Sequence, residues 1–206
     1  MKNKAKFKIT ILDIVHISII LSLYLTSEFL NGIWNMDVLP GIKIQITPII
    51  IIICSFVLGP WKTGSAISIF VFIIAWTNPK AFISGVTWVK TPKLIFGEYM
   101  LDYVLPLFSI SFIPGLYKYL KPKHSYFITL SIALFFKFIS HVCAGILFWG
   151  GYAQDAFGNS WKGYILGYAI LANLLGMSFI IPATYLLAWP SVNKIKLLIL
   201  EGANRF

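Results

Sequence analysis

A stripe of polar and aromatic residues runs through one of the most apolar parts of the chain. Lys137, His141, Gly145 and Trp149 recur every four residues within the stretch 125–149. Because an α-helix has 3.6 residues per turn, this spacing places all four on one face, with Gly145 leaving a gap between two rings. Ionisable groups at membrane depth are costly and usually face a bundle interior or a cavity. The stripe therefore predicts a small-molecule site with room for a ligand ring.

Two other parts of the sequence carry residues that could serve the same ligand. Asp102 and Tyr103 open another apolar segment, while Tyr168 and Asn173 lie near the start of the last one. A carboxylate attracts a cation or accepts hydrogen bonds from an amino group, and tryptophan offers the best face for a flat cationic ring. Histidine, asparagine and tyrosine add donors and acceptors for a heteroaromatic edge. This combination favours a flat, positively charged, nitrogen-containing solute.

Each of these residues also has a structural explanation when taken alone. Trp149 could be an interfacial anchor, since Trp and Tyr are enriched in membrane interfaces. Asp102 could be a helix N-terminal charge, His141 a satisfied core histidine, and Lys137 a structural ion-pair partner. The i, i+4 relation of His141 to Lys137 argues against metal ligation, and the sequence carries no P-loop. We therefore expect no metal site, no cofactor and no catalytic residue.

The elements that must position these residues follow from composition. The chain has 206 residues, of which 58% are hydrophobic and 12% charged, against roughly 25% charged in soluble domains. These values indicate an integral membrane protein of the all-α class, with residues 1–206 forming one domain of six transmembrane helices. The expected apolar segments are 9–30, 44–58, 64–77, 100–117, 125–149 and 164–189.

Charge predicts how the chain sits in the bilayer. Of 17 basic residues, eleven fall on the side that would hold both termini and five on the other. The positive-inside rule therefore places both termini in the cytoplasm of a multi-pass cell-membrane protein. His141 and Trp149 would then lie in the outer leaflet. The net charge of +10 would serve topology and attraction to the lipid bilayer, with no nucleic acid as partner.

At these residues the sequence resembles the thiamine-specific substrate-binding subunit, or S-component, of energy-coupling factor (ECF) transporters. The resemblance covers roughly residues 95–175. An acid followed by tyrosine is matched by Asp102-Tyr103, and the pattern Lys-x3-His-x3-Gly-x3-Trp is matched from Lys137 to Trp149. The last part of the pattern, a Trp-Lys-Gly loop followed by a tyrosine and an asparagine, is matched by Trp161-Lys162-Gly163, Tyr168 and Asn173.

The resemblance implies a six-helix protein that captures thiamine from outside and works with an ECF transmembrane coupling subunit and two ATPase subunits. Asp102 would hold the aminopyrimidine or offset the thiazolium charge, and Lys137 would orient or neutralise that acid. Trp149 would stack on the ligand, with Trp34 as a second wall. The implied hydrogen-bonding partners are Tyr103, His141, Tyr168 and Asn173.

Four local expectations accompany this interpretation. The tight connection between the second and third segments should span residues 59–63, and the loop 78–99 should form an outer lid. Gly145→Leu should fill the space for a ligand ring while leaving the helix intact. The resemblance further implies a docking face for the coupling subunit on the first helix, where Ser18 and Ser22 have the spacing for close helix approach.

Alternatives remain open at this point. The chain could be an S-component for another heteroaromatic vitamin or precursor. A second class is a small membrane-embedded enzyme acting on a lipid or prenyl group, for which Glu98 and Asp102, four residues apart, are the one close acidic pair. A stand-alone secondary carrier is a third possibility, although no half-to-half repeat is visible.

Overall fold

Helices dominate the described part of the chain. The computed structural model of the protein describes residues 9–34, 37–39, 42–43, 45–77, 92–120, 124–149 and 164–203. Within these stretches most of the backbone is helical, and one short antiparallel ribbon pairs β1 (Asp37–Leu39) with β2 (Ile42–Lys43). The all-α class expected from composition is therefore confirmed.

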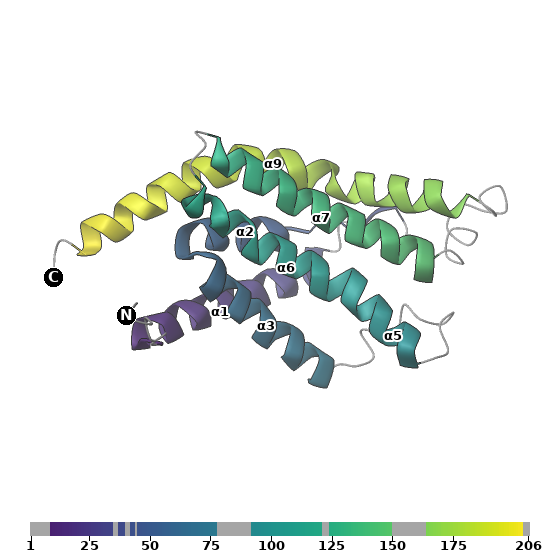
Figure 1. Ribbon diagram of the computed structural model, residues 1–206, viewed down its shortest axis with the longest axis horizontal. Coiled ribbons are helices and arrows are strands. Elements are labelled where there is room, and N and C mark those ends of the chain that lie inside the picture. The colour runs from purple at the N-terminus through teal and green to yellow at the C-terminus, as the bar shows by residue number, and fades with distance from the viewer. Residues whose placement is uncertain are drawn as a thin grey trace, which may run out of the picture.

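The helices pack side by side along one long axis (Figure 1). In chain order the helical elements are α1 (Ile11–Trp34), α2 (Thr47–Leu58), α3 (Pro60–Thr77), α5 (Pro92–Tyr99), the π-helical turn η1 (Met100–Val104), α6 (Leu105–Phe112), the 3-10 turn η2 (Pro114–Tyr119), α7 (Ser125–Phe148) and α9 (Ile165–Ala203). The start of α1 and the end of α9 lie at one end of the bundle, and α5 lies at the other (Figure 1).

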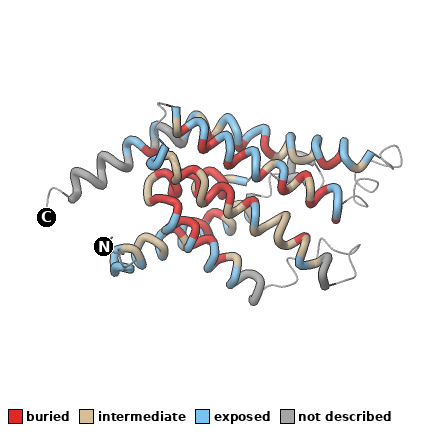
Figure 2. Tube along the Cα trace, in the orientation of Figure 1, coloured by how far each residue is buried: buried red, intermediate tan, exposed pale blue. Residues whose placement is uncertain are grey.

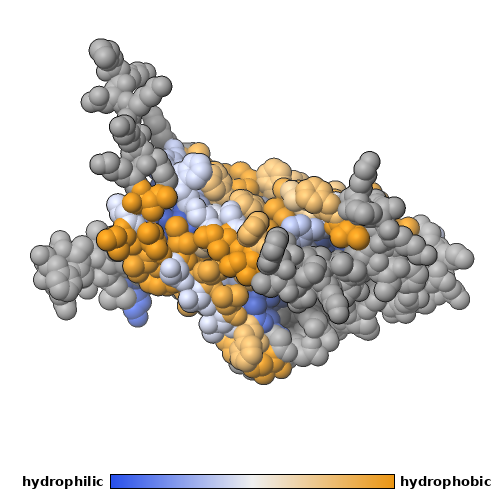
Figure 3. Space-filling model, turned by 90° about the horizontal axis from the view of Figure 1, so that it is seen from below, coloured by the Kyte–Doolittle hydropathy of each residue, from blue (hydrophilic) through white to orange (hydrophobic). Residues whose placement is uncertain are grey.

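Four helical stretches are long and apolar enough to cross a membrane: Ile11–Asn31, Ile95–Tyr119, Ser125–Phe148 and Ile165–Lys194. Large apolar side chains such as Phe72 and Leu186 are exposed on the outside of the bundle. Much of the described surface in Figure 3 is accordingly hydrophobic. Exposed apolar surface on this scale is typical of side chains that face lipid, so these features are those of a multi-pass membrane protein.

The short helix α2 forms the centre of the packing. Ile51, Ile52 and Phe56 are almost fully buried, in a core shared with residues of α1, α3, α6, α7 and α9. Figure 2 shows buried positions concentrated around this helix. A helix that is hydrophobic on all sides is expected to be enclosed by others. The Ile-rich run 49–53 is therefore helical, as the requirement for internal backbone hydrogen bonds predicts.

The connection from α2 to α3 is shorter than expected. Only Gly59 separates the two helices, with φ of 95°, because α3 already begins at Pro60. The prediction of a connection over 59–63 is wrong at its far end. Proline is well suited to the first turn of a helix, where its missing N–H would have no helical partner, and glycine adopts positive φ without a steric cost.

The helical stretch that carries Asp102 also starts earlier than expected. Helix α5 begins at Pro92, so Asp102 does not open a span but lies in η1, in the middle of a continuous run. Proline again favours the first helical turn. Residues 92–99 of the expected lid are therefore helical, whereas residues 78–91 lie outside the described part of the chain.

Candidate ligand-binding site

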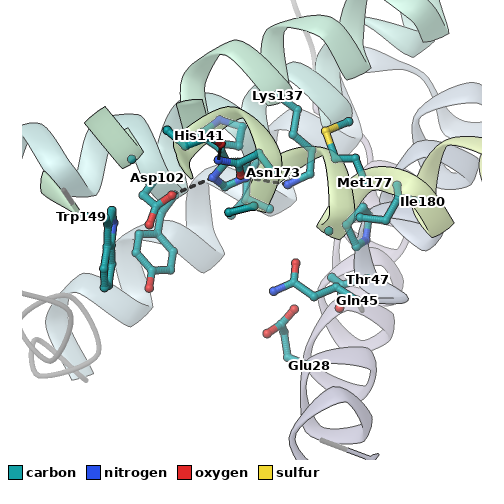
Figure 4. A pocket seen from close by; sticks show the side chains of 18 of the residues that line it. Glu28, Gln45, Thr47, Asp102, Lys137, His141, Trp149, Asn173, Met177 and Ile180 are labelled. Atoms are coloured by element: carbon teal, nitrogen blue, oxygen red, sulfur yellow. Dashed lines mark hydrogen bonds and ion pairs between the residues drawn. The ribbon is translucent and has the colours of Figure 1, made fainter. Parts of the chain in front are cut away.

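A cavity of about 530 Å³ opens between α1, α2, η1, α6, α7 and α9 (Figure 4). Its size falls within the range of small-molecule sites. The walls combine apolar side chains with a few polar and charged groups. The lining consists of Tyr24, Glu28, Gln45, Thr47, Pro48, Asp102, Tyr103, Pro106, Leu107, Lys137, His141, Gly145, Trp149, Tyr168, Ala169, Ala172, Asn173, Gly176, Met177 and Ile180.

Eight of the nine residues predicted from the sequence line this one cavity. They come from η1, α7 and α9, which lie far apart in the sequence: Asp102, Tyr103, Lys137, His141, Gly145, Trp149, Tyr168 and Asn173. The ninth, Trp34, is the last residue of α1, and its side chain lies outside the described part of the structure. Their role in binding stays a prediction.

A chain of hydrogen bonds joins three of these residues across two helical elements. His141 Nε2 lies 2.7 Å from Lys137 Nζ, and His141 Nδ1 lies 2.7 Å from Asp102 Oδ1. An ammonium group has no acceptor capacity, so Nε2 accepts from Lys137 and the ring proton on Nδ1 is donated to the carboxylate. Lys137 is buried, with 6% of its surface exposed. The imidazole thus holds Asp102 in place and keeps it apart from the ammonium.

This arrangement leaves hydrogen-bonding capacity directed at the cavity. Within the described residues, no partner bonds the second carboxylate oxygen of Asp102. The side-chain amide of Asn173 donates to the carbonyl of Ala169 at 2.8 Å, which fixes its orientation and leaves its own oxygen as an acceptor. A carboxylate and an amide oxygen are both acceptors, so this wall is suited to a ligand that brings N–H groups or positive charge.

Two aromatic residues of the cavity, Trp149 and Tyr168, lie at the end of α7 and near the start of α9. Trp149 follows the last turn of α7 and packs against the buried pair Ala144 and Phe148. Its backbone N–H bonds the carbonyl of Gly145 at 3.2 Å, which continues the hydrogen bonding of α7 to this residue. Tyr168 is 8% exposed near the start of α9. Trp149 is half-buried and lines the cavity.

Gly145 has a packing role that the sequence did not predict. A Cβ atom at this position would lie 2.9 Å from the Cβ of Ala169, because α7 and α9 approach closely here. Real Cβ atoms do not come so near, so any side chain at 145 would push the two helices apart. Gly145→Leu would therefore also displace α9 at Ala169, whereas its expected effects, filling the ligand space and leaving helix α7 itself intact, stay predictions.

Several polar lining residues were missed from the sequence. Glu28 and Gln45 lie with Thr47 on the wall opposite Asp102 in Figure 4. Asn31 positions this wall, because its amide donates to Thr47 Oγ1 at 2.6 Å and its oxygen accepts from the backbone N–H of Ile46 at 3.1 Å. The spacing of Tyr24 and Glu28, one helical turn apart, is the signal that could have identified α1 as a wall.

Only one member of the acidic pair Glu98 and Asp102, on which the enzyme alternative depended, lines the cavity. Asp102 lines it, but Glu98 is buried elsewhere with 2% exposure. Among the described residues there is no group of three or more His, Cys, Asp or Glu side chains that could hold a metal ion. The free thiols Cys54 and Cys143 do not line the cavity either. The described lining thus offers hydrogen bonds, charge and aromatic surface.

The fold and cavity together define a helical protein with membrane-length apolar helices and an internal polar cavity. No protein-family model matches the chain, and no curated protein matches it. The structure is similar to a solved structure of ThiT from Listeria monocytogenes. The two chains share 19% sequence identity with a TM-score of 0.48, over 88% of this chain and 96% of the ThiT chain.

Proposed function

We propose that this protein captures thiamine at the outer face of the cell membrane and delivers it into the cell as the S-component of an ECF transporter. One observation carries the proposal: eight residues that resemble the thiamine-specific pattern come from three separate segments and line one cavity. The loop Trp161-Lys162-Gly163 of that pattern lies outside the described part of the chain. The capture step is binding and involves no change of covalent bonds, so the protein is not an enzyme.

The chemistry of the cavity supports a cationic heteroaromatic ligand. Asp102 accepts from the aminopyrimidine or offsets the thiazolium charge, while Trp149 offers its face to a ring. Lys137 is engaged with His141 and so does not neutralise Asp102 by direct contact. Glu28 adds a second carboxylate to the lining. The lining is therefore electrostatically suited to a positively charged solute rather than to an anionic one.

The membrane arrangement in this proposal has six spans with both termini in the cytoplasm. It is supported by the excess of basic residues on that side and by the position of the start of α1 and the end of α9 at one end of the bundle (Figure 1). The junction of α5 with η1 and the end of α7 lie toward the opposite end. The cavity is then reached from the outer leaflet.

Energy for uptake comes from partners in this proposal, namely a transmembrane coupling subunit and two ATPase subunits. The proposed docking face is the outer side of α1. Ser18 and Ser22 are exposed there, one helical turn apart, and each is followed by a half-exposed apolar residue, Ile19 or Leu23. Small side chains at this spacing permit close approach of another membrane helix.

The experiment that tests this function is a ligand panel on the purified protein in detergent. Thiamine should raise the melting temperature, since a ligand that binds only the folded state stabilises it by mass action. Riboflavin, biotin and pantothenate, as chemically different vitamins, should leave it unchanged. A response to another vitamin alone would overturn thiamine specificity, and thiamine uptake into liposomes by this chain without partners would overturn the S-component assignment.

A further inference from the structure

One carbonyl of the π-helical turn has lost its helical partners. The N–H of Leu105 bonds the carbonyl of Met100, five residues earlier, instead of that of Leu101. In continued π geometry the next N–H would serve Leu101, but it would belong to Pro106, which has none. Both backbone donors that could satisfy the Leu101 carbonyl are thus missing. A buried carbonyl without a donor costs free energy, so a partner from elsewhere is needed.

That partner is a serine on the neighbouring helix. Ser140, buried in α7, donates its hydroxyl to the carbonyl of Leu101 at 2.5 Å. The next residue, His141, bonds the next residue of the turn, Asp102, through Nδ1 at 2.7 Å. Two consecutive residues of α7 therefore bond two consecutive residues of η1, one through the backbone and one through the side chain.

We propose that Ser140 is a positioning residue that fixes the π-helical turn so that the carboxylate of Asp102 meets both His141 and the ligand. Ser140 does not line the cavity and acts through Asp102. Pro106 explains why the hydroxyl is required, because it removes the donor that the helix itself would supply. The binding test of this inference rests on the proposed function, whereas its spectroscopic test does not.

Ser140→Ala should weaken thiamine binding about tenfold, consistent with loss of one buried hydrogen bond. Ser111→Ala is the matched control: Ser111 is fully buried in α6, and its hydroxyl bonds Phe108 within the same helix. This control should bind thiamine as the unmodified protein does. Equal loss of affinity in both variants would overturn the positioning role.

A double-variant cycle separates positioning from general loss of structure. In the Asp102→Asn background, Ser140→Ala should have little further effect on affinity, because there is no longer a carboxylate to position. The same tenfold loss in both backgrounds would contradict the proposal.

A second pair of variants tests the role of Pro106. Pro106→Ala supplies a backbone N–H to Leu101, so Ser140→Ala combined with Pro106→Ala should bind thiamine more tightly than Ser140→Ala with Pro106 retained. Absence of this recovery would also overturn it.

A readout without ligand distinguishes failure of this inference from failure of the proposed function. With 15N-labelled histidine, the Nδ1–H proton of His141 that is donated to Asp102 should give a strongly downfield NMR signal. We expect this signal to shift or broaden in Ser140→Ala and to stay in Ser111→Ala. The unmodified protein could fail to bind thiamine while the His141 signal still changes in Ser140→Ala and not in Ser111→Ala. The proposed function would then be wrong, and the positioning role of Ser140 would still be supported. An unchanged signal in Ser140→Ala would overturn that role.

Discussion

Two clusters in the molecule each combine a lysine, a histidine and an aspartate, but the three residues contact one another in a different order. At the end of the bundle that holds the start of α1, Lys62 stands in the middle, 2.9 Å from Asp13 Oδ1 and 2.9 Å from His16 Nδ1. In the cavity the histidine stands in the middle, between Lys137 and Asp102. The order of the three residue types therefore differs between the two clusters.

That order decides which groups stay open to a ligand. In the cluster at the start of α1 the ammonium of Lys62 contacts the carboxylate of Asp13 directly. The other oxygen of Asp13 accepts from the backbone N–H and hydroxyl of Thr10 at 2.9 and 2.7 Å. Asp13 and Thr10 thus form a capping box that closes the start of α1. In the cavity the imidazole uses one oxygen of Asp102 and no described residue bonds the other. Both carboxylate oxygens of Asp13 therefore have partners in the cluster at the start of α1, whereas the cavity cluster leaves one oxygen of Asp102 for a ligand.

The largest expected effect comes from neutralising one carboxylate of each cluster. Asp102→Asn should weaken thiamine binding about thirty- to a hundredfold, because hydrogen bonds to charged groups are worth about 1.5 to 3 kcal/mol. Asp13→Asn should leave binding unchanged. Isothermal titration calorimetry of both variants measures the two affinities. A similar loss of thiamine affinity in the two would contradict the assignment of the cavity cluster, and not the cluster at the start of α1, to binding.

A tryptophan near each cluster gives the next test. Trp149→Ala should weaken thiamine binding roughly tenfold or more through loss of a stacking face. Trp61 is the matched control, since it is 62% exposed beside Lys62 and contacts Phe112 edge to face at 5.2 Å. Trp61→Ala should bind thiamine normally in the same titration. Normal binding by Trp149→Ala would remove the ring from the site.

Two glycines sharpen the comparison through stability. Gly145→Ala should lower the free energy of unfolding by about 1 to 3 kcal/mol, since its Cβ would meet that of Ala169 at 2.9 Å. Gly64→Ala in α3 should be neutral or stabilising, because its Cβ finds ordinary contact with Phe112 at 3.5 Å and alanine favours helix. Thermal melts in detergent measure both.

The compensating variant identifies the cause. Ala169→Gly combined with Gly145→Ala should recover most of the lost stability, because it removes the atom that clashes. A melting temperature for Gly145→Ala equal to that of the unmodified protein would show that α7 and α9 do not pack this closely.

The smallest effect is expected for Lys62, in the cluster at the start of α1. Lys62→Met should reduce the melting temperature slightly and leave thiamine affinity unchanged, because partly exposed ion pairs contribute little. Lys137→Met should instead weaken binding, since Lys137 donates to His141, which in turn holds Asp102. If Lys62→Met lost thiamine affinity and Lys137→Met did not, the cluster at the start of α1 and not the cavity cluster would be the binding site.

The sequence was most informative where local periodicity determines geometry. The spacing from Lys137 to Trp149 predicts one helical face, and that face does meet a cavity because every fourth residue of a helix shares a side. The helical state of α2 followed from the need to satisfy backbone groups internally. Both predictions depend only on local residue spacing and on the absence of water in the bilayer core.

Features that depend on partners distant in sequence could not be predicted. The packing role of Gly145 needs knowledge that Ala169 faces it. The spacing of Tyr24 and Glu28 indicates a shared face of α1, but not which helices that face meets. At the π-helical turn the Leu101 carbonyl is served by Ser140 of α7, and Pro106, which has no N–H, lies on another element. A proline in an apolar helix can be accommodated in several ways, and the neighbouring helix decides which.

The most direct test of the account is a fluorescence titration of the unmodified protein with thiamine. Trp149 lines the cavity, so binding should quench its emission in a saturable manner. In Trp149→Phe the quench should be clearly smaller while calorimetry still reports binding. No quench and no heat with thiamine over the concentration range that saturates a micromolar site would contradict the proposed thiamine site.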